Sequence, residues 1–543
     1  MRANIAMARG SKAVRKDPAC GTCRKKCRKC DRARPVCNRC KSKGLHCEGY
    51  PPRFQFCESL QTPNLITASD EREPEEDQER AQPNVLPTNE LTPAQNLSSP
   101  ASTQNSLSSD HPSQCRRLLQ TLSQGASPAS PQDRSLGAPS PSPATIIGHP
   151  VDDLLLTGNS QKLLVYFDKE LSPHLTIVVE GADNPFRVHV LPLAYNHTGV
   201  LHAVQGLTAC HLHLSPSGAN QVDMATALQH RVAALSGLSS LLIKEEIYGL
   251  TEAEEEAVLA IIFLLVLHDI CELGISAHAV HLNGVSFLCG RIASPLVRVQ
   301  RSAATIFFLS ALSWLDVLRG FSGAEKLTYS ENVRKCVANI TSPHAALHTL
   351  VGCPAVIFLK IGDVIAAAKQ HMQGMLSTVN FQTKLDEAER TFRDLDLDAI
   401  EYPTPHSEWR QLAEAYRHAS LLRTLRWPDT FAIPCEDQKI RSSVSAILDC
   451  CANVPMESPF FKRLLFPLFL AATETSERHQ IHYASLCIGK IRRSTGFQHA
   501  AMMEVLEGVW AERKLKTRGW TNVPWMEFTC SESIQQQHAY LFF

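Results

Sequence analysis

The chain has 543 residues, of which 44% are hydrophobic, and equal numbers of basic and acidic residues, 54 of each. This composition is typical of a folded cytosolic or nuclear protein and allows two or three domains. The zero net charge conceals an asymmetry, because residues 1–56 carry 16 Lys and Arg against 3 Asp and Glu, while the remainder carries 38 against 51. The basic segment predicts a polyanionic partner, since clustered Lys and Arg neutralise phosphates.

Residues 1–16 are expected to form a basic N-terminal arm. The stretch RGSKAVRK, residues 9–16, is typical of either a nuclear-import signal or a phosphate-binding arm, and both interpretations stay open. The start, MRANIAMARGSK, lacks the apolar stretch of a secretory signal. We therefore interpret the nineteen cysteines as thiols or metal ligands rather than as disulfides.

Seven cysteines follow the arm in the stretch CGTCRKKCRKCDRARPVCNRCKSKGLHC, residues 20–47. Six of them form three pairs that are each 17 residues apart, so that the unit CxxC, six residues and a third Cys occurs twice: Cys20 with Cys37, Cys23 with Cys40, and Cys30 with Cys47. Cys27 stands outside this repeat, because its counterpart is Gly44. We predict that Cys27 is not a metal ligand.

This repeat indicates zinc chemistry. A CxxC pair places two thiolates where both reach one tetrahedral Zn²⁺ at about 2.3 Å, and the third Cys closes the site. Three ligands per copy leave each zinc one ligand short, and the economical solution is that one Cys of each copy bridges both metals. Two Zn²⁺ held by six thiolates then stabilise a segment that is too short for a core of its own.

Three other uses of these cysteines are less favoured. A disulfide framework lacks a secretory signal, and redox chemistry at a CxxC pair lacks a neighbouring βαβ unit. A single zinc site made from the four CxxC cysteines leaves the repeat of Cys30 and Cys47 without a reason. The binuclear cluster accounts for all six positions.

With the stretch EGYPPRF that follows, this segment resembles the fungal binuclear zinc cluster, the DNA-binding domain of fungal transcription factors. The shared features are the six ligand spacings, the basic stretch after the second ligand, and Asp31, Pro35 and Gly44 at matching places. The resemblance implies a metal-stabilised domain of two short helices over residues 17–50. It also implies that two Zn²⁺ are bound by Cys20, Cys23, Cys30, Cys37, Cys40 and Cys47.

The same resemblance implies that the basic helix after Cys23 points into the major groove of double-stranded DNA and reads a CGG-like triplet. Relatives usually place Lys, Arg or His at the position of Cys27, so the commonest base contact is replaced here. We therefore expect Lys26 and Arg28 to contact bases. Phosphate contacts are expected from a second set: Arg24, Lys25, Lys29 and Arg32.

Residues 51–153 are predicted to be a disordered linker rich in Pro and Ser. No Phe, Trp or Tyr occurs from Cys57 to Val165, so the segment cannot bury enough apolar surface to fold. An acidic run, DEREPEEDQER, is interpreted as a solvated stretch of this linker; the alternative, an acidic activation segment, is less favoured because bulky hydrophobic residues are not interleaved with the acidic ones. The part after the cysteines, EGYPPRFQFCESLQTP, has no heptad pattern, so we expect a monomer, or a dimer formed through the C-terminal domain.

Residues 154–543 are predicted to be a large all-α domain. TEAEEEAVLAIIFLLVLHDI opens with Thr251 and Glu254 at the spacing of a capping box, and further apolar periodic stretches follow, such as AATIFFLSALSWLDVLRG, SEWRQLAEAYRHASLLRTLRW and HAAMMEVLEGVWAERK. The apolar runs are too short or too interrupted for a membrane span, so we expect buried helices. The fair candidate for a strand is LTIVVEG, residues 175–181.

Three stretches of this domain, NPFRVHVLPLA, FFKRLLFPLFLAATET and VWAERKLKTRGWTNVPWMEF, resemble the fungal-specific transcription factor domain. The ending QQQHAYLFF is similar to the acriflavine sensitivity control subgroup. The resemblance implies a regulatory domain with an effector pocket or a surface for coactivators or the transcription machinery. It implies no catalytic residues.

Catalytic and metal motifs in this domain are incomplete. NGVSFLCG has Leu288 where a nucleophile elbow requires Gly. Neither the histidines near Cys210 nor the pair His278 and His281 is completed by further ligands, so we interpret them as packed or surface residues. The ten cysteines from Cys210 to Cys530 have no zinc spacing and are expected to be buried apolar residues.

Together these features predict a nuclear, sequence-specific transcription factor of the RNA polymerase II type. It is expected to regulate a metabolic, secondary-metabolite or resistance gene set and not to be an enzyme or to contact a membrane. The alternative is a metabolite-binding protein or enzyme that a basic zinc module localises. Two zinc ions per chain and a preferred DNA site would distinguish the first hypothesis from the second.

Overall fold

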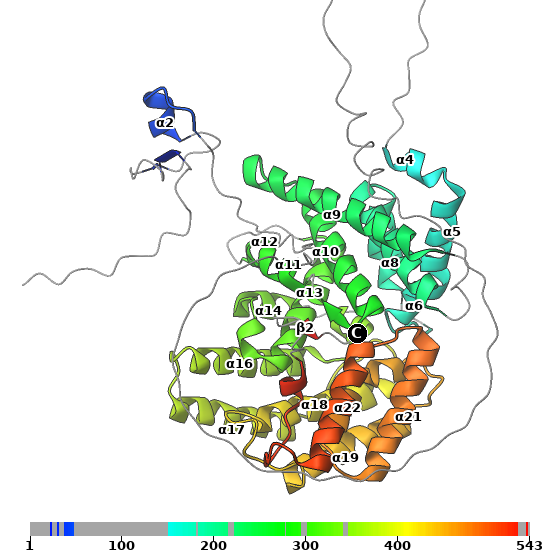
Figure 1. Ribbon diagram of the computed structural model, residues 1–543, viewed down its shortest axis with the longest axis vertical. Helices are drawn as coiled ribbons and strands as arrows, with labels where there is room; N and C mark the ends of the chain where they lie inside the picture. The colour runs from blue at the N-terminus through cyan, green and yellow to red at the C-terminus, as the bar shows by residue number, and fades with distance from the viewer. Residues whose placement is uncertain are drawn as a thin grey trace, which may run out of the picture. The chain divides into compact units, whose positions relative to one another are not determined.

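Figure 1 shows a computed structural model of the protein. The structure describes residues 22–23, 30–31, 37–47, 150–180, 183–215, 222–276, 279–294, 301–339, 346–529 and 539–540. The basic arm and residues 51–149 of the expected linker lie outside these ranges.

The described N-terminal residues include the short helix α2 (Asn38–Ser42), which begins directly after Cys37. The basic stretch Arg24–Lys29, expected to form the other helix, lies outside the described residues. The fold class implied by the resemblance, a small cysteine-rich segment followed by a large helical region, is confirmed.

The helical body begins at Pro150, four residues before the boundary expected from the sequence. Its first part has helices and short π-helical turns in this order: α4 (Pro150–Leu155), α5 (Gly158–Tyr166), η1 (Phe167–Leu171), α6 (Ser172–His174), η2 (Phe186–Val190), α7 (Leu191–Ala194), α8 (Thr198–Leu214), α9 (Met224–Ile247), α10 (Glu252–Glu272), α11 (Ala279–Gly284) and α12 (Ser286–Ile292).

The second part continues with α13 (Ala303–Ser322), η3 (Ala324–Lys326), α14 (Glu331–Ala338), α15 (Ala346–Val351), α16 (Ala355–Met372), α17 (Thr378–Asp394), α18 (Glu408–Leu425), α19 (Gln438–Asn453), η4 (Phe461–Leu464), α20 (Leu465–Thr473), α21 (Arg478–Thr495), α22 (Ala500–Leu515) and η5 (Trp525–Phe528). Two strands of two residues each, β1 (Ile275–Ser276) and β2 (Ala539–Tyr540), pair antiparallel. The predicted all-α character of this region is confirmed.

Helix α10 begins where the sequence predicts. The Thr251 side chain accepts a hydrogen bond from the Glu254 backbone N–H, and the Glu254 carboxylate accepts one from the Thr251 backbone N–H, so the capping box is complete. From Ala257 to Cys271 every residue is buried. A helix that is apolar on all sides belongs in the interior, and α10 packs there against α8 and α13.

Helix α13 is another interior helix. It is the one helix among the described residues that is long and apolar enough to cross a membrane, and 89% of its most apolar window is buried inside the protein. Its Phe307 ring contacts Phe263 of α10, with ring centroids 6.0 Å apart. The burial confirms the expectation of a core helix.

The predicted strand at residues 175–181 is wrong for the part that the structure describes. Residues up to Glu180 form a bend and an extended segment with no strand partner. The Ile177 backbone N–H and the Thr176 hydroxyl both donate to the carbonyl oxygen of Thr349, at 2.8 and 2.7 Å. These two hydrogen bonds therefore hold the segment against the helical core, and it is not part of a sheet.

The cysteines of the body are mostly interior residues, as the sequence predicts. Eight of the nine that the structure describes between Cys210 and Cys487 are buried, and Cys336 is half-buried. Burial raises the pKa of Cys450 to about 12, and that of its neighbour Cys451 is raised as well. These thiols behave as small apolar side chains.

Candidate metal centre

The start of helix α2 is held by two side chains of the cysteine-rich segment. The Cys37 sulfur accepts a hydrogen bond from the Cys40 backbone N–H at 3.3 Å. The Asp31 carboxylate accepts from the backbone N–H groups of Asn38 and Arg39, at 3.1 and 3.4 Å. Because the first N–H groups of a helix lack partners within it, these acceptors fix where α2 begins. Asp31 thereby ties the third cysteine of the first copy, Cys30, to the second copy.

The end of α2 is fixed by glycine. Gly44 has a φ of +60°, a conformation that residues with a Cβ rarely adopt. The Leu45 backbone N–H donates to the Cys40 carbonyl oxygen at 2.9 Å, and the Thr22 hydroxyl donates to the His46 carbonyl oxygen at 2.8 Å. These bonds turn the chain back toward Cys47. A cysteine at residue 44 would be strained, which explains in physical terms why the second copy has no counterpart of Cys27.

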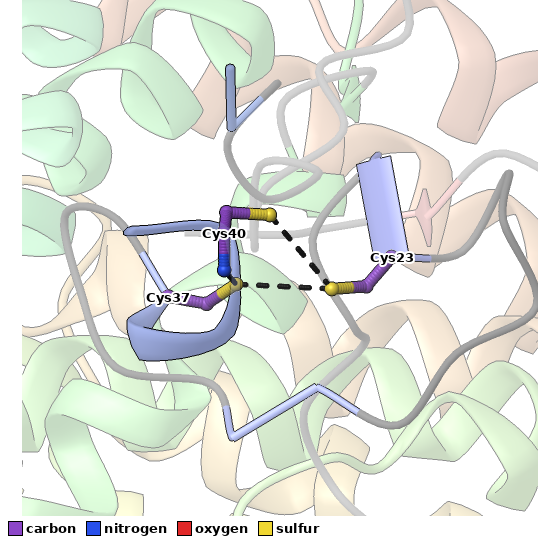
Figure 2. Close-up of side chains that lie close together, drawn as sticks. All are labelled: Cys23, Cys37 and Cys40. Carbon is purple, nitrogen blue, oxygen red and sulfur yellow. Dashed lines mark hydrogen bonds between the residues drawn. The ribbon is translucent and has the colours of Figure 1, made fainter. Parts of the chain in front are cut away.

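Three sulfur atoms gather inside this frame (Figure 2). Cys23 Sγ lies 3.8 Å from Cys37 Sγ and 3.9 Å from Cys40 Sγ, so thiols of both copies meet. Ligands at about 2.3 Å from one tetrahedral Zn²⁺ are separated by about 3.8 Å, the edge of the tetrahedron. A disulfide requires sulfurs about 2.05 Å apart, much closer than the separations from Cys23 to Cys37 and Cys40. The thiols therefore fit a zinc ion.

Cys37 belongs to two groups of possible metal ligands. One is formed with Cys23 and Cys40, and the other with Cys30 and Asp31. Within each group the ligand atoms lie within 4.8 Å of one another. A cysteine shared in this way is a candidate for a bridging thiolate, for which the shortage of ligands in the sequence calls.

Comparisons with known protein families agree with this geometry. Residues 18–56 match the fungal Zn(2)-Cys(6) binuclear cluster domain, and residues 162–543 match the fungal specific transcription factor domain. The chain belongs to the fungal zinc cluster transcription factors. It is thus a DNA-binding transcription factor whose N-terminal domain binds two zinc ions. No curated protein and no solved structure matches the chain.

The structure describes five of the six cysteines that the zinc cluster is expected to use: Cys23, Cys30, Cys37, Cys40 and Cys47. The first four are buried and Cys47 is half-buried. Cys20, the surplus Cys27 and the six expected DNA contacts, Arg24, Lys25, Lys26, Arg28, Lys29 and Arg32, lie outside the described residues. Their roles stay predictions.

Arg39 is a residue of the zinc cluster that sequence reasoning missed. Its guanidinium donates a hydrogen bond to Cys23 Sγ at 3.7 Å. Two Zn²⁺ with six thiolates carry a formal charge of −2, so a cation beside a sulfur stabilises the cluster. The signal in the sequence was that Arg39 lies inside the second CxxC pair. The corresponding position of the first pair is Thr22, so this basic residue is not part of the repeat. Lys41 and Lys43 of the same segment are exposed.

The two histidines that follow Cys210 have structural partners. His211 lies within hydrogen-bond distance of the Thr495 carbonyl oxygen at 2.8 Å, and His213 of the Val222 carbonyl oxygen at 3.0 Å. His278 lies outside the described residues. The Ser286 hydroxyl donates to the Asn283 carbonyl oxygen at 2.8 Å, as a helix residue does. These contacts agree with the interpretation as packed residues.

Lys462 and Arg463 lie beside a small cavity in the interior of the body. Trp314, Tyr416, Lys462 and Arg463 are among the residues that line this cavity, which has room for about one water molecule. Burial lowers the pKa of Lys462 to about 6, with a further contribution from Arg463, and its ammonium donates to the Pro173 carbonyl oxygen. The cavity is too small for an organic effector, so the expected effector pocket stays a prediction.

Proposed function

We propose that this transcription factor acts in the nucleus, reads CGG-like triplets through its zinc cluster, and regulates a metabolic, secondary-metabolite or resistance gene set. The observation that carries the proposal is the meeting of Cys23 with Cys37 and Cys40 at the spacing of zinc ligands. That contact brings both copies of the repeat onto shared metal ions. The basic stretch between Cys23 and Cys30 is then tied to the cluster at both ends.

The proposed zinc ligands are the six cysteines of the repeat: Cys20, Cys23, Cys30, Cys37, Cys40 and Cys47. The shared position of Cys37 supports its role as one bridging thiolate. The repeat gives Cys20 as its counterpart, since 37 − 20 = 17, so we assign the second bridge to Cys20. Cys27 takes no part in metal binding in this assignment.

The proposed DNA contacts divide into two classes. Lys26 and Arg28 flank Cys27 and are assigned to base edges, because the usual cation is missing between them. Arg24, Lys25, Lys29 and Arg32 are assigned to phosphates. Lys41 and Lys43, which are exposed on the second copy, are placed to add to the positive potential that attracts DNA.

The domain limits proposed from the sequence are an arm at residues 1–16, the zinc cluster at 17–50, a linker at 51–153 and the regulatory domain at 154–543. Helix α4, which begins at Pro150, supports a start of the folded body close to the proposed limit. We assign contacts with coactivators or the transcription machinery to this body. The similarity to the acriflavine sensitivity control subgroup is part of the same proposal.

Selection of bound sequences from a random DNA library by the full-length, zinc-loaded protein tests the proposal. We expect enrichment of CGG-like triplets, and the number of triplets per selected site reports how many clusters bind together. Selection of a different motif would overturn the CGG assignment, and no enrichment over random DNA would overturn sequence-specific reading.

A matched pair of variants tests the division of contacts. Lys26→Ala is expected to weaken binding to the selected site by about tenfold or more and to leave binding to random DNA almost unchanged. Lys25→Ala is expected to weaken binding to both DNAs alike and to reduce the dependence of affinity on salt. Equal losses on both DNAs for the two variants would contradict the assignment.

A further inference from the structure

Helix α9 carries a second apolar face that its neighbours do not cover. It lies on the outside of the helical body beside α8 and α10 (Figure 1). Its inner face is buried through Ala227, Ala234, Leu238, Leu241 and Leu242. A surface helix with one buried face is expected to present charged residues to water on the other.

The outer face of α9 departs from this expectation. The most exposed residues of the helix are all uncharged: Ala225, Leu228, Gln229, Val232, Ser236, Ser240, Ile243 and Ile247. Their spacing of three and four residues aligns them in one stripe along the helix. Val232 is 65% exposed and Ile243 is 58% exposed, which is unusual for large aliphatic side chains that follow one line. We call these eight residues the α9 stripe.

One charged side chain that borders the stripe, Lys244, pairs with Glu254 of the same chain at 2.6 Å. Two other charged residues of the helix, Arg231 and Glu245, lie on its inner side, where they pair with Asp269 at 3.0 Å and with Arg291 at 2.6 Å. A second apolar surface can therefore approach without leaving these charges unpaired. This arrangement, an apolar centre with a satisfied polar border, is that of a protein interface.

The four large aliphatic residues of the stripe lie symmetrically about its midpoint. Leu228 and Ile247 are equally far from the midpoint of the stripe, and so are Val232 and Ile243. The small residues Ser236 and Ser240 lie near the midpoint. When two such helices run antiparallel about a two-fold axis, aliphatic residues meet aliphatic residues at both ends, and the serines allow a close approach at the centre.

We propose that the α9 stripe is a self-association surface, and that its partner is the α9 stripe of a second copy of this chain, held antiparallel about a two-fold axis. The sequence that follows the zinc cluster has no heptad pattern, so a dimer of this chain would have to be formed by the body. The reversed symmetry of the stripe favours a copy of itself over an unrelated helix, whose pattern has no reason to match it.

The size of the stripe indicates a weak dimer. From Leu228 to Ile247 it extends about 29 Å, and with a helix width of about 10–12 Å it covers on the order of 300 Å². A stable interface covers about 800 Å² on each partner, so we expect a dissociation constant of about 10–100 µM in solution. DNA with two half-sites would hold two chains together at an effective concentration of up to about a millimolar, at which the association is favourable.

Sedimentation velocity of the full-length zinc-loaded protein, without DNA, tests the inference over about 1–200 µM, a range around the expected constant. We expect a reversible dimer whose fraction rises with concentration. Because DNA is absent, this outcome does not depend on whether the chain reads CGG triplets. A protein that stays monomeric across the range overturns the inference, and so does a dimer that the stripe variants below leave intact.

Val232→Glu places a charge in the stripe. It is expected to raise the dissociation constant by tenfold or more, because the new glutamate of each copy then lies against the apolar Ile243 of the other copy. Ile243→Ser is a milder variant that is expected to raise it several-fold. Val379→Glu is the matched control, since Val379 is 76% exposed on α17, away from the stripe. Circular dichroism verifies that each variant is folded. An equal effect of Val379→Glu would contradict the assignment to α9.

Discussion

The zinc cluster and the helical body are folded by different forces. Among the described residues of the cluster, the buried core consists of four cysteines, with Leu45 and Cys47 packed against them. The body instead buries large side chains throughout, among them Phe263 and Trp409, which are fully inaccessible to water. The cluster therefore depends on metal binding, whereas the body depends on the removal of apolar surface from water. Each is expected to lose its structure under conditions that leave the other intact.

Replacement of Cys37 by Ser should have the largest effect, because this cysteine is assigned to both zinc ions. We expect the variant to lose both metals and all specific DNA binding, since structural zinc contributes about 10 kcal/mol or more to such domains. Zinc content by atomic emission and gel shifts on the selected DNA site measure the two losses. The helical signal in circular dichroism should persist, because the body holds most of the helices.

Two companion variants sharpen this result. Cys47→Ser removes a ligand that is assigned to one metal, so it is expected to retain part of the zinc. Cys27→Ser removes the cysteine outside the repeat and is expected to retain both ions, while the DNA preference can change. Loss of both metals from the Cys27 variant would reject the ligand assignment.

Trp409→Ala should destabilise the helical body and leave the zinc cluster intact. Trp409 is completely buried in α18, its ring lies edge-on to Phe460 with centroids 4.8 Å apart, and its indole N–H donates to the Thr404 hydroxyl at 2.8 Å. Removal of the ring leaves a cavity and an unpaired partner, at a cost of about 3–5 kcal/mol. Urea unfolding followed by circular dichroism measures this loss, and zinc content should stay at two ions per chain. A simultaneous loss of zinc would mean that the two regions are not independent.

The stability of the body should fall as the pH is lowered from 7 to 5. Burial, with a contribution from Arg492, lowers the pKa of His499 to about 4, whereas an unfolded histidine titrates near 6.5. Between these values the unfolded chain binds more protons than the folded chain, so stability is full above about pH 6.5 and is lost as the pH falls toward 4. This one residue accounts for about 2 kcal/mol of the change between pH 7 and 5.

The measurement is the urea midpoint at several pH values for the wild type and for His499→Gln. The variant is expected to show a shallower dependence between pH 7 and 5, although His348, whose pKa burial also lowers to about 4, keeps part of it. His479→Gln, at an exposed position of α21, serves as the control. An unchanged slope in the His499 variant would contradict the assignment.

The sequence predicted the metal site and the helices because both are encoded locally. The 17-residue repeat identified the cysteines that the structure brings together, and the Thr251 capping box marked the start of α10. The strand predicted at residues 175–181 is wrong because the Ile177 backbone N–H and the Thr176 hydroxyl donate to a distant carbonyl oxygen, that of Thr349, which local patterns cannot reveal. The stripe on α9 was equally hidden, since periodicity does not tell which of two apolar faces of a helix is covered.

Asp31→Ala should have the smallest effect of these variants. It tests a residue that supports the zinc cluster without being one of its assigned ligands. Asp31 is exposed, and its carboxylate accepts hydrogen bonds from the backbone N–H groups of Asn38 and Arg39 at the start of α2. Loss of such a cap costs about 1 kcal/mol, which corresponds to a roughly fivefold weaker zinc affinity in a competition with a chelator. Asp31→Asn keeps an acceptor oxygen and should recover most of the affinity. If both variants lost a whole zinc ion, Asp31 would be a metal ligand rather than a cap.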